Sequence, residues 1–383
     1  MSVTTPRGFR AAGVTAGLKA SGRPDLALVV NDGPGYAAAA VFTSNRVEAA
    51  PVTWSRQVLA DGRVDAVVLN SGGANACTGH QGFQDTHRTA ELVGAALNVG
   101  AGDVVVCSTG LIGELLPMER IEAGVEMAVA ALDGDGGANA AVAIMTTDTV
   151  PKEAAYQGEG WAVGGMAKGA GMLAPALATM LVVLTTDADV TGLDLDAALR
   201  AATAVTFDRI DSDGCMSTND TVVLLASGAS GVAPTQAELT AAVTDVCASL
   251  ARQLIADAEG AHHDVAIEVR TAATEADALE VARAVARNNL VKCAIFGNDP
   301  NWGRILAAVG TTAAAFEASA LDVTMNGIPV CRGGGVGADR SLVDLSGREV
   351  RIAIDLHAGS ASATVWTNDL THDYVHENSA YST

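Results

Sequence analysis

The sequence is poor in aromatic side chains and in positive charge. Phe, Trp and Tyr make up 4% of the 383 residues, and 23 Lys and Arg stand against 44 Asp and Glu. The formal net charge of −21 argues against a basic surface for nucleic acid or for an anionic membrane. Two interpretations of the acidity stay open, namely plain solubility and a field that attracts a cationic substrate. With 49% hydrophobic residues, the chain can bury a large core.

Targeting signals and cysteine pairs are also missing. The first ten residues, MSVTTPRGFR, lack the apolar segment of a signal peptide, and no apolar run reaches the roughly 18 residues that span a bilayer. The six cysteines are widely spread without a CxxC pair, which favours free thiols. We therefore expect a cytoplasmic protein with no membrane and no nucleic-acid partner.

Several common catalytic motifs are absent. The chain has no GxxxxGK[ST], HExxH or GxSxG sequence and no zinc-like spacing of Cys and His. The glycine-rich stretches 72–79 and 164–171 do not link a strand to a helix in a βαβ unit, so they do not predict a dinucleotide site. His262 and His263 are predicted to be a surface pair, with substrate contact as the alternative. The sequence predicts no metal and no organic cofactor.

The apolar pattern predicts an α+β protein. The order of elements is β-rich, then mixed, then αβ, which favours layers over a regular βαβ series. The predicted strands are Leu26–Val30, Ala38–Phe42, Ala66–Leu69, Val104–Cys107, Met180–Leu184, Thr221–Ala226, Val350–Leu356 and Ala361–Thr367. The predicted helices are Asp85–Leu97, Glu119–Leu132, Leu193–Ala204, Gln236–Ala258 and Asp277–Ala294.

The most unusual segment is GGMAKGAGMLAPALATMLVVLTTD, residues 164–187. A glycine-rich loop precedes an apolar strand, and Thr179 lies between them. A threonine hydroxyl needs a base to act as a nucleophile, and the α-amine of an N-terminal threonine, with an ordinary pKa near 8, is one such base. Freeing that amine requires cleavage after Ala178, whose small side chain leaves room for attack. On chemistry alone, a threonine ahead of an apolar strand is usually just the start of that strand.

A family resemblance supports the nucleophile. KGAGMLAPALATML (168–181) resembles the self-cleavage segment of the ornithine acetyltransferases, the glutamate N-acetyltransferase family of arginine biosynthesis. The resemblance extends over nearly the whole chain. The other segments that carry it, in order, are GFRAAGVTAGLKASG (8–22), VFTSNRVEAAPV (41–52), NSGGANACTG (70–79), STGLIG (108–113), MTTDTVPK (145–152), DGCMSTNDTV (213–222), DAEGA (257–261), FGNDPNWGRILAA (296–308) and ENSAYST (377–383).

The resemblance implies a layered α/β sandwich of the ornithine acetyltransferase and DmpA-like type, with a smaller C-terminal α/β lobe. It implies self-cleavage between Ala178 and Thr179 into fragments 1–178 and 179–383. Within the second fragment, residues 179–275 are expected to complete the catalytic core. Residues 276–383 are expected to form the lobe and an ordered tail over the active site.

The resemblance also implies roles for single residues. Thr179 would carry an acetyl group from N2-acetyl-L-ornithine to L-glutamate, while Thr109 and Gly110 would form the oxyanion hole. The substrate-binding residues would be Thr146, Lys168, Thr179, Glu259, Asn378 and Thr383. Thr147 is an alternative to Thr146. EGAHHD (259–264) differs from the commoner EGATK, and NWGR (301–304) and STND (217–220) are expected to be scaffolding turns with Trp302 in the core.

Three points stay open at this level. Family members that also accept acetyl-coenzyme A exist, and no residue here decides that question. The family implies a heterotetramer of two alpha and two beta fragments. The alternative enzyme is an N-terminal-nucleophile aminopeptidase or amidase, which gives the acyl group to water, and the non-enzymatic alternative is an acidic scaffold that would stay uncut.

Overall fold

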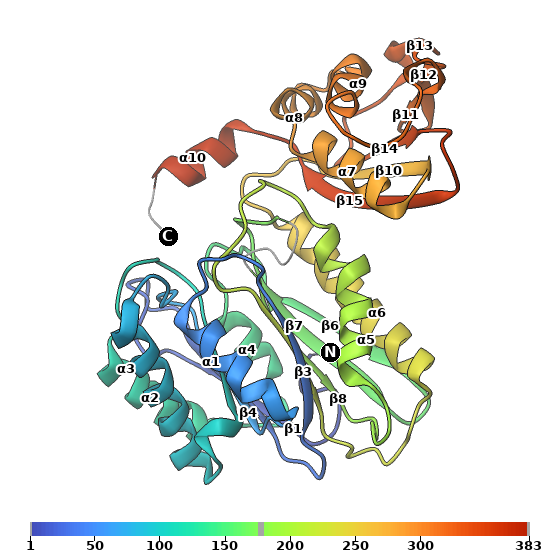
Figure 1. Ribbon diagram of the computed structural model, residues 1–383. Coiled ribbons are helices and arrows are strands. Elements are labelled where there is room, and N and C mark those ends of the chain that lie inside the picture. Colours follow the sequence, from blue (N-terminus) through green and yellow to red (C-terminus); the bar gives the residue numbers. More distant parts are fainter. Residues whose placement is uncertain (1, 175–179, 381–383) are drawn as a thin grey trace.

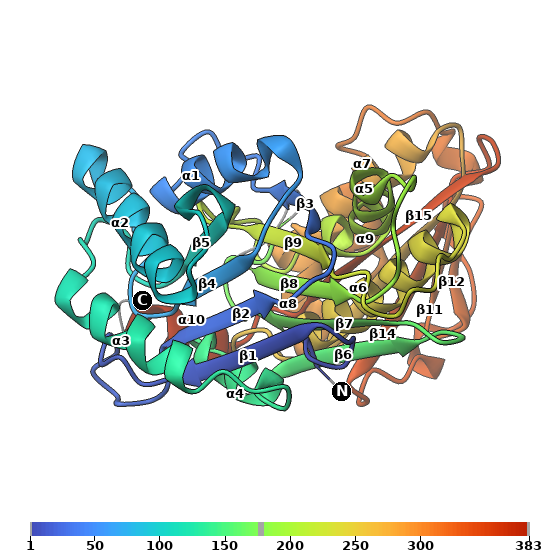
Figure 2. The same ribbon diagram turned by 90° about the horizontal axis from the view of Figure 1, so that it is seen from below.

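Two stacked β-sheets form the centre of the protein. The computed structural model describes residues 2–174 and 180–380. The first sheet has the order β1-β2-β4-β5 and the second the order β3-β9-β8-β7-β6 (Figure 2). The strands of the first sheet are β1 (Phe9–Val14), β2 (Leu26–Asn31), β4 (Ala66–Asn70) and β5 (Val104–Ser108). Those of the second are β3 (Ala37–Phe42), β6 (Lys152–Gln157), β7 (Ala162–Lys168), β8 (Leu181–Thr186) and β9 (Thr221–Ala226).

The strands are apolar on both faces because each sheet is covered on both sides. In β2, Ala27 and Val29 belong to the core between the two sheets, whereas Leu26 and Leu28 belong to a separate core beneath helices. This division follows from the alternation of side chains along a strand. The result is a four-layer αββα sandwich, which confirms the predicted α+β class.

Helices cover the two outer faces of the sandwich (Figure 2). The helices on the outer face of the first sheet are α1 (Ala50–Val58), α2 (Gly79–Leu97) and α3 (Met118–Ala130). Helix α4 (Gly137–Ala143) instead contributes Ala140 and Ala141 to the core between the two sheets. The helices on the second sheet are α5 (Leu195–Val205) and α6 (Gln236–Ala256). A capping box between Thr235 and Glu238 begins α6. Among the described residues α6 is the one helix long and apolar enough to cross a bilayer, and its apolar side packs instead against α5, β6 and β7.

The C-terminal lobe is a six-stranded sheet with the order β13-β12-β11-β14-β10-β15 and three helices (Figure 1). Its strands are β10 (Asp264–Ala272), β11 (Asp322–Met325), β12 (Ile328–Arg332), β13 (Gly335–Val336), β14 (Glu349–Asp355) and β15 (Ala361–Asn368). Its helices are α7 (Glu275–Ala286), α8 (Asn289–Phe296) and α9 (Trp302–Val309). Because β10 pairs with β14 and β15, the lobe begins at Asp264, earlier than the expected boundary after residue 275.

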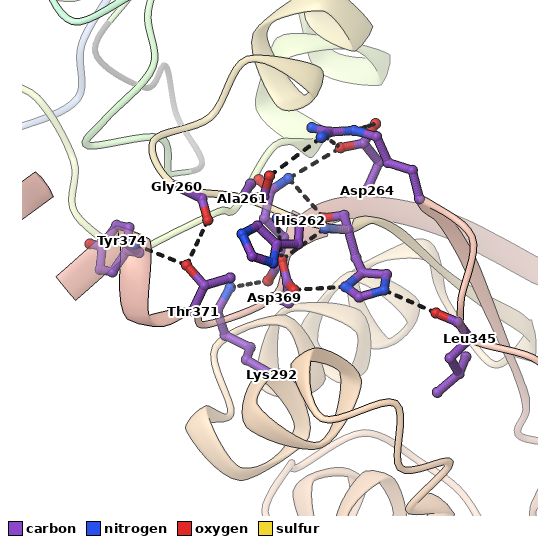
Figure 3. A network of polar contacts seen from close by, with 12 residues as sticks. Gly260, Ala261, His262, Asp264, Lys292, Leu345, Asp369, Thr371 and Tyr374 are labelled. Atoms are coloured by element: carbon purple, nitrogen blue, oxygen red, sulfur yellow. Dashed lines mark hydrogen bonds and ion pairs between the residues drawn. The ribbon is translucent and has the colours of Figure 1, made fainter. Parts of the chain in front are cut away.

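The chain returns from the lobe to the core through α10 (His372–Ala380), which extends over the sandwich (Figure 1). Polar contacts fix the start of this return. Asp369 accepts the backbone N–H groups of His262 and His263 at 3.0 and 2.9 Å, and Thr371 Oγ1 donates to Gly260 O at 2.6 Å (Figure 3). The structure describes the predicted C-terminal tail as far as Ala380, the last residue of α10. Thr383 lies outside the described residues.

Candidate active site

The predicted cleavage segment connects β7 and β8, which are neighbours in the second sheet. Lys168 pairs with Leu181 in the register of the two strands, so residues 169–180 form the connection. Residues 175–179, which include Ala178 and Thr179, lie outside the described residues. Before this gap, Leu173 O accepts the N–H of Ser212 at 2.6 Å. After it, the N–H of Met180 donates to Asp220 Oδ1 at 3.0 Å.

The STND turn fixes the strand ends around that gap, as predicted for a scaffold. Asn219 Nδ2 donates to Ala74 O at 2.6 Å and to Ser108 O at 2.8 Å. Asp220 is fully buried, and burial raises the pKa of its carboxyl well above the ordinary value. Its Oδ2 has no hydrogen-bond partner in the described parts of the chain. Met180, the residue after Thr179, is thus held by the Asp220 carboxyl group, which favours the neutral, protonated form.

Thr109 and Gly110 follow the end of β5. Gly73 donates its N–H to Thr109 O at 3.1 Å, which brings two loops together. Gly110 has φ +131°, and a Cβ there would lie 2.7 Å from Gly73 N, so only glycine fits. Within residues 2–174 and 180–380, the Gly110 N–H has no acceptor. A free N–H beside a hydroxyl is the donor pair that an oxyanion needs.

Lys168 connects this pair to a buried ionic network. Its ammonium, 1% exposed, donates to Thr109 Oγ1 at 3.4 Å and lies 4.0 Å from Asp148 Oδ2. Lys152 is also buried, and its Nζ lies 2.7 Å from Asp148 Oδ1 and 2.6 Å from Asp257 Oδ2. Burial lowers the pKa of Lys168, while Asp148 opposes that effect. Charges this deep require partners, and each lysine has one.

Asp148 is the centre of that network. It accepts N–H groups from Thr146 at 2.9 Å and from Gly169 at 2.6 Å. Burial disfavours its charged form, but Lys168, Lys152 and the hydrogen bonds to the carboxylate outweigh burial and lower its pKa to about 2. One carboxylate therefore fixes Thr146, Lys168 and the first residue of the predicted cleavage loop.

Glu259 follows α6 and lies against the same loop. Its backbone N–H donates to Ala170 O at 2.9 Å, and a Cβ at Gly171 would lie 2.6 Å from its carboxylate. On the other side, Asn378 Nδ2 of α10 donates to Glu259 Oε2 at 3.0 Å. Two of the predicted substrate-binding residues, 119 positions apart in the chain, therefore meet.

An open cavity of about 1180 Å³ joins these parts. Its lining includes four predicted residues, namely Gly110, Thr146, Thr147 and Glu259, so Thr146 and its alternative are equally placed. Lys168 lies below the surface of the cavity rather than in its lining. Among the described residues, no group of three His, Cys, Asp or Glu side chains could hold a metal ion.

The His262–His263 prediction needs a correction for its second member. His262 is exposed, lines the cavity and contacts Asp373 at 2.8 Å. His263 is buried, with Nδ1 2.7 Å from Asp369 Oδ2 and Nε2 3.0 Å from Leu345 O (Figure 3). It contributes to the junction between core and lobe, because both ring nitrogens contact segments of the C-terminal part.

Sequence reasoning missed the ionic network and the anchor of Met180. Asp148 and Lys152 lie in MTTDTVPK, and Asp220 lies in STND, but no spacing rule predicts that they meet. The sequence offered one indication of the network, namely charged residues within apolar segments. A Lys and two Asp in such surroundings must pair with opposite charges when they are buried.

The Thr109 hydroxyl, the Gly110 N–H and the buried Lys168 ammonium thus lie together beside an open cavity. The ArgJ family model matches residues 10–383. Three similar proteins bear the name arginine biosynthesis bifunctional protein ArgJ. They are those of Streptomyces avermitilis (67% identical, 100% of both chains), Thermobifida fusca (66%, 100% of both) and Mycobacterium leprae (59%, 99% of this chain and 95% of the relative).

Two solved structures are similar in sequence. Ornithine acetyltransferase from Mycobacterium tuberculosis complexed with ornithine is 61% identical, with a TM-score of 0.45, and the match covers 47% of this chain and 96% of that chain. The ArgJ protein of Bacillus halodurans is 35% identical, with a TM-score of 0.48, and the match covers 51% and 97%. The chain belongs to the ArgJ family of arginine-biosynthesis acyltransferases.

Proposed function

We propose that the chain cleaves itself between Ala178 and Thr179. The Thr179 hydroxyl attacks the Ala178 carbonyl, the peptide C–N bond breaks, and the resulting ester is hydrolysed by water, which leaves a free α-amine on Thr179. The observation that carries the proposal is the anchoring of both sides of the segment, at Leu173 by Ser212 and at Met180 by Asp220. Fixed ends favour a reactive arrangement of the bond between them.

The mature enzyme would transfer acetyl groups in two steps. The Thr179 amine takes the hydroxyl proton while the oxygen attacks the acetyl carbonyl of N2-acetyl-L-ornithine. The negative charge that develops on the carbonyl oxygen is stabilised by the Gly110 N–H and the Thr109 hydroxyl. Ornithine leaves with a proton, and the amine of L-glutamate then attacks the acetyl ester to form N-acetylglutamate.

Charge complementarity supports an amino-acid substrate. Lys168 suits an α-carboxylate, and its position beside Thr109 would bring that group close to the oxyanion hole. Glu259 suits the side-chain ammonium of ornithine, and Asn378 orients its carboxylate. Thr146 or Thr147 supplies a hydroxyl in the same lining, and Thr383 is proposed as a further contact from the tail.

Two further proposals concern the donor and the assembly. The relatives' name, bifunctional, supports a second activity, and we propose acetyl-coenzyme A as a second acetyl donor to glutamate. The fragments 1–178 and 179–383 would stay associated as a heterotetramer of two copies each, in the cytoplasm.

Intact-mass analysis of purified protein tests the cleavage. A pair of fragments in place of the 38.6 kDa chain is expected for the natural sequence, and a single uncut species is expected for Thr179→Ala. Thr179→Ser, which keeps the hydroxyl, is the matched control and should still be cut. A natural chain that stays uncut would refute the proposal.

A half-reaction assay tests the transfer and separates it from the hydrolase alternative. The enzyme is incubated with N-acetylornithine, with and without glutamate, and acetate and N-acetylglutamate are measured. Transfer predicts acetylation of fragment 179–383 and N-acetylglutamate in proportion to added glutamate. Release of acetate at a rate that glutamate does not change would identify the aminopeptidase or amidase instead.

A further inference from the structure

Lys19 is a cation in the wall of the active-site cavity. It lies between β1 and β2 and lines the same cavity as Thr146 and Glu259. Its ammonium donates to Pro24 O at 2.9 Å and to Met145 O at 2.6 Å. An ammonium has three N–H donors. The third has no acceptor in the described residues, and no described carboxylate lies within 4.0 Å of it.

Lys19 is half-buried, whereas the other three lysines are buried, and the Lys168 ammonium among them lies 4.0 Å from Asp148 Oδ2. Lys152 pairs with Asp148 and Asp257, and Lys292 donates to three acceptors: Ser212 O, Thr367 Oγ1 and Asn368 O. Lys19 has two neutral acceptors and an open side. Burial accordingly lowers its pKa to about 8, although Asp25 acts in the opposite direction. An anionic ligand would supply the missing partner.

The loop around Lys19 is fixed. The buried carboxylate of Asp25 accepts the N–H groups of Ala16 and Leu18 at 2.6 Å and of Lys19 at 2.9 Å. Leu18 packs against Gly72 so closely that a Cβ at Gly72 would lie 2.4 Å from Leu18 Cβ. The ammonium is therefore held in place before any ligand binds, which lowers the entropic cost of binding.

The two substrates of the proposed reaction have side chains of opposite charge, and both must bind in the same cavity. The donor, acetylornithine, ends in an ammonium, and the acceptor, glutamate, ends in a carboxylate. Glu259 suits the first group and repels the second, so the acceptor needs a cation elsewhere in the lining. Lys19 provides one on the β1–β2 loop, with Arg23 as a second cation of the same loop.

We propose that the Lys19 ammonium binds the side-chain carboxylate of the acceptor amino acid and so selects glutamate. The inference rests on the proposed acetyl transfer and adds a separate subsite to it. The side chain of the bound amino acid can rotate, so that the ornithine ammonium reaches Glu259 and the glutamate carboxylate reaches Lys19. One cavity then accepts both substrates in turn.

The test measures the two half-reactions separately in Lys19→Gln. Acetylation of fragment 179–383 by N-acetylornithine should stay within about twofold of the natural enzyme, because that step does not use the subsite. The KM for glutamate should rise about 10- to 100-fold, the range expected for a lost hydrogen bond to a charged group. Glutamine, which lacks the charge, should lose little, so the preference for glutamate over glutamine should fall by a similar factor.

Two further variants keep the test decisive. Lys19→Arg retains the charge and should recover part of the glutamate preference. Arg88→Gln removes one positive charge from the exposed face of α2. It should change neither the KM for glutamate nor the preference for glutamate over glutamine. An unchanged glutamate-to-glutamine ratio in Lys19→Gln, or equal rises in KM for donor and acceptor, would overturn the subsite. Absence of acetyl transfer in the natural enzyme would instead refute the proposed function.

Discussion

Asn378 and Glu259, 119 positions apart in the chain, are joined by a hydrogen bond of 3.0 Å between Nδ2 and Oε2. The bond connects the C-terminal helix α10 to the residue that follows α6. The helix has no buried residue of its own, so contacts of this kind determine where it lies. The cavity therefore depends on residues that a truncated chain would lose.

Removal of the Asn378 amide should weaken binding of the cationic donor. In Asn378→Ala, Glu259 loses a donor that orients its carboxylate, and the KM for N-acetylornithine should rise about threefold to tenfold, with a smaller change in kcat. Asn378→Asp should be worse, since it places a like charge beside Glu259. Ser379→Ala, one residue further on, is the control, and an equal effect there would point to general loosening of the helix.

Gly171→Ala should displace Glu259 without unfolding the protein. The new Cβ would lie 2.6 Å from the Glu259 carboxylate, the mobile end of a side chain that can move aside. We expect the KM for N-acetylornithine to rise as it does in Glu259→Gln, with the unfolding temperature nearly unchanged. Gly102→Ala, whose Cβ would meet nothing within 4 Å, is the matched control. A large fall in unfolding temperature for Gly171→Ala alone would contradict this account.

Asp148→Asn should destabilise the fold by about 3–5 kcal/mol at neutral pH, because two buried lysines lose their shared anion. The pKa of Asp148 is about 2 in the folded protein, below its ordinary 3.8. Its stabilising effect is thus present above pH 4 and is lost as the pH falls towards 2. Urea unfolding at a series of pH values should show the difference between the two proteins shrink over that window.

The control for this series is Asp196→Asn, which removes an exposed partner of Arg200. It should cost about 0–1 kcal/mol at any pH. A difference between natural protein and Asp148→Asn that stays constant down to pH 2 would show that the Asp148 charge does not stabilise the network.

Asp220→Asn should behave almost like the natural chain, whereas Asp220→Ala should not. Burial raises the pKa of Asp220, so its carboxyl resembles a neutral amide, and asparagine keeps an oxygen for the Met180 N–H. Alanine leaves that N–H without its acceptor beside the cleavage site. The rate of fragment formation, followed by intact mass, should fall about tenfold or more in Asp220→Ala. Similar rates in both variants would exclude the anchoring role.

Local patterns predicted part of the fold and missed strands such as β6 and β7. Thr221–Ala226 was predicted as a strand with the bounds that β9 has, because a short apolar run between polar residues has few other solutions. The single helix expected over 277–294 is divided, since the Asn288 side chain accepts the N–H groups of Leu290 and Val291 and starts α8 anew. A cap of this kind is visible in sequence only when one expects a break.

The site was predictable only where the family resemblance named residues. It identified Glu259 and Asn378, which meet, and Thr109 and Gly110 beside Lys168. It did not identify Asp148, because that residue acts through contacts between segments far apart in sequence. Lys19 was likewise missed, since its proposed role depends on how many acceptors its ammonium has in the folded protein.

The order β3-β9-β8-β7-β6 has a consequence for the two proposed fragments. Strands β8 and β9 would belong to the second fragment, yet they lie between β3 on one side and β7 on the other, both from the first. The second sheet would then be built from both polypeptides, and neither fragment alone would contain all of its strands. Genes that encode the halves separately should therefore give insoluble products, because the pieces form a pair by being severed after folding and not by meeting in solution.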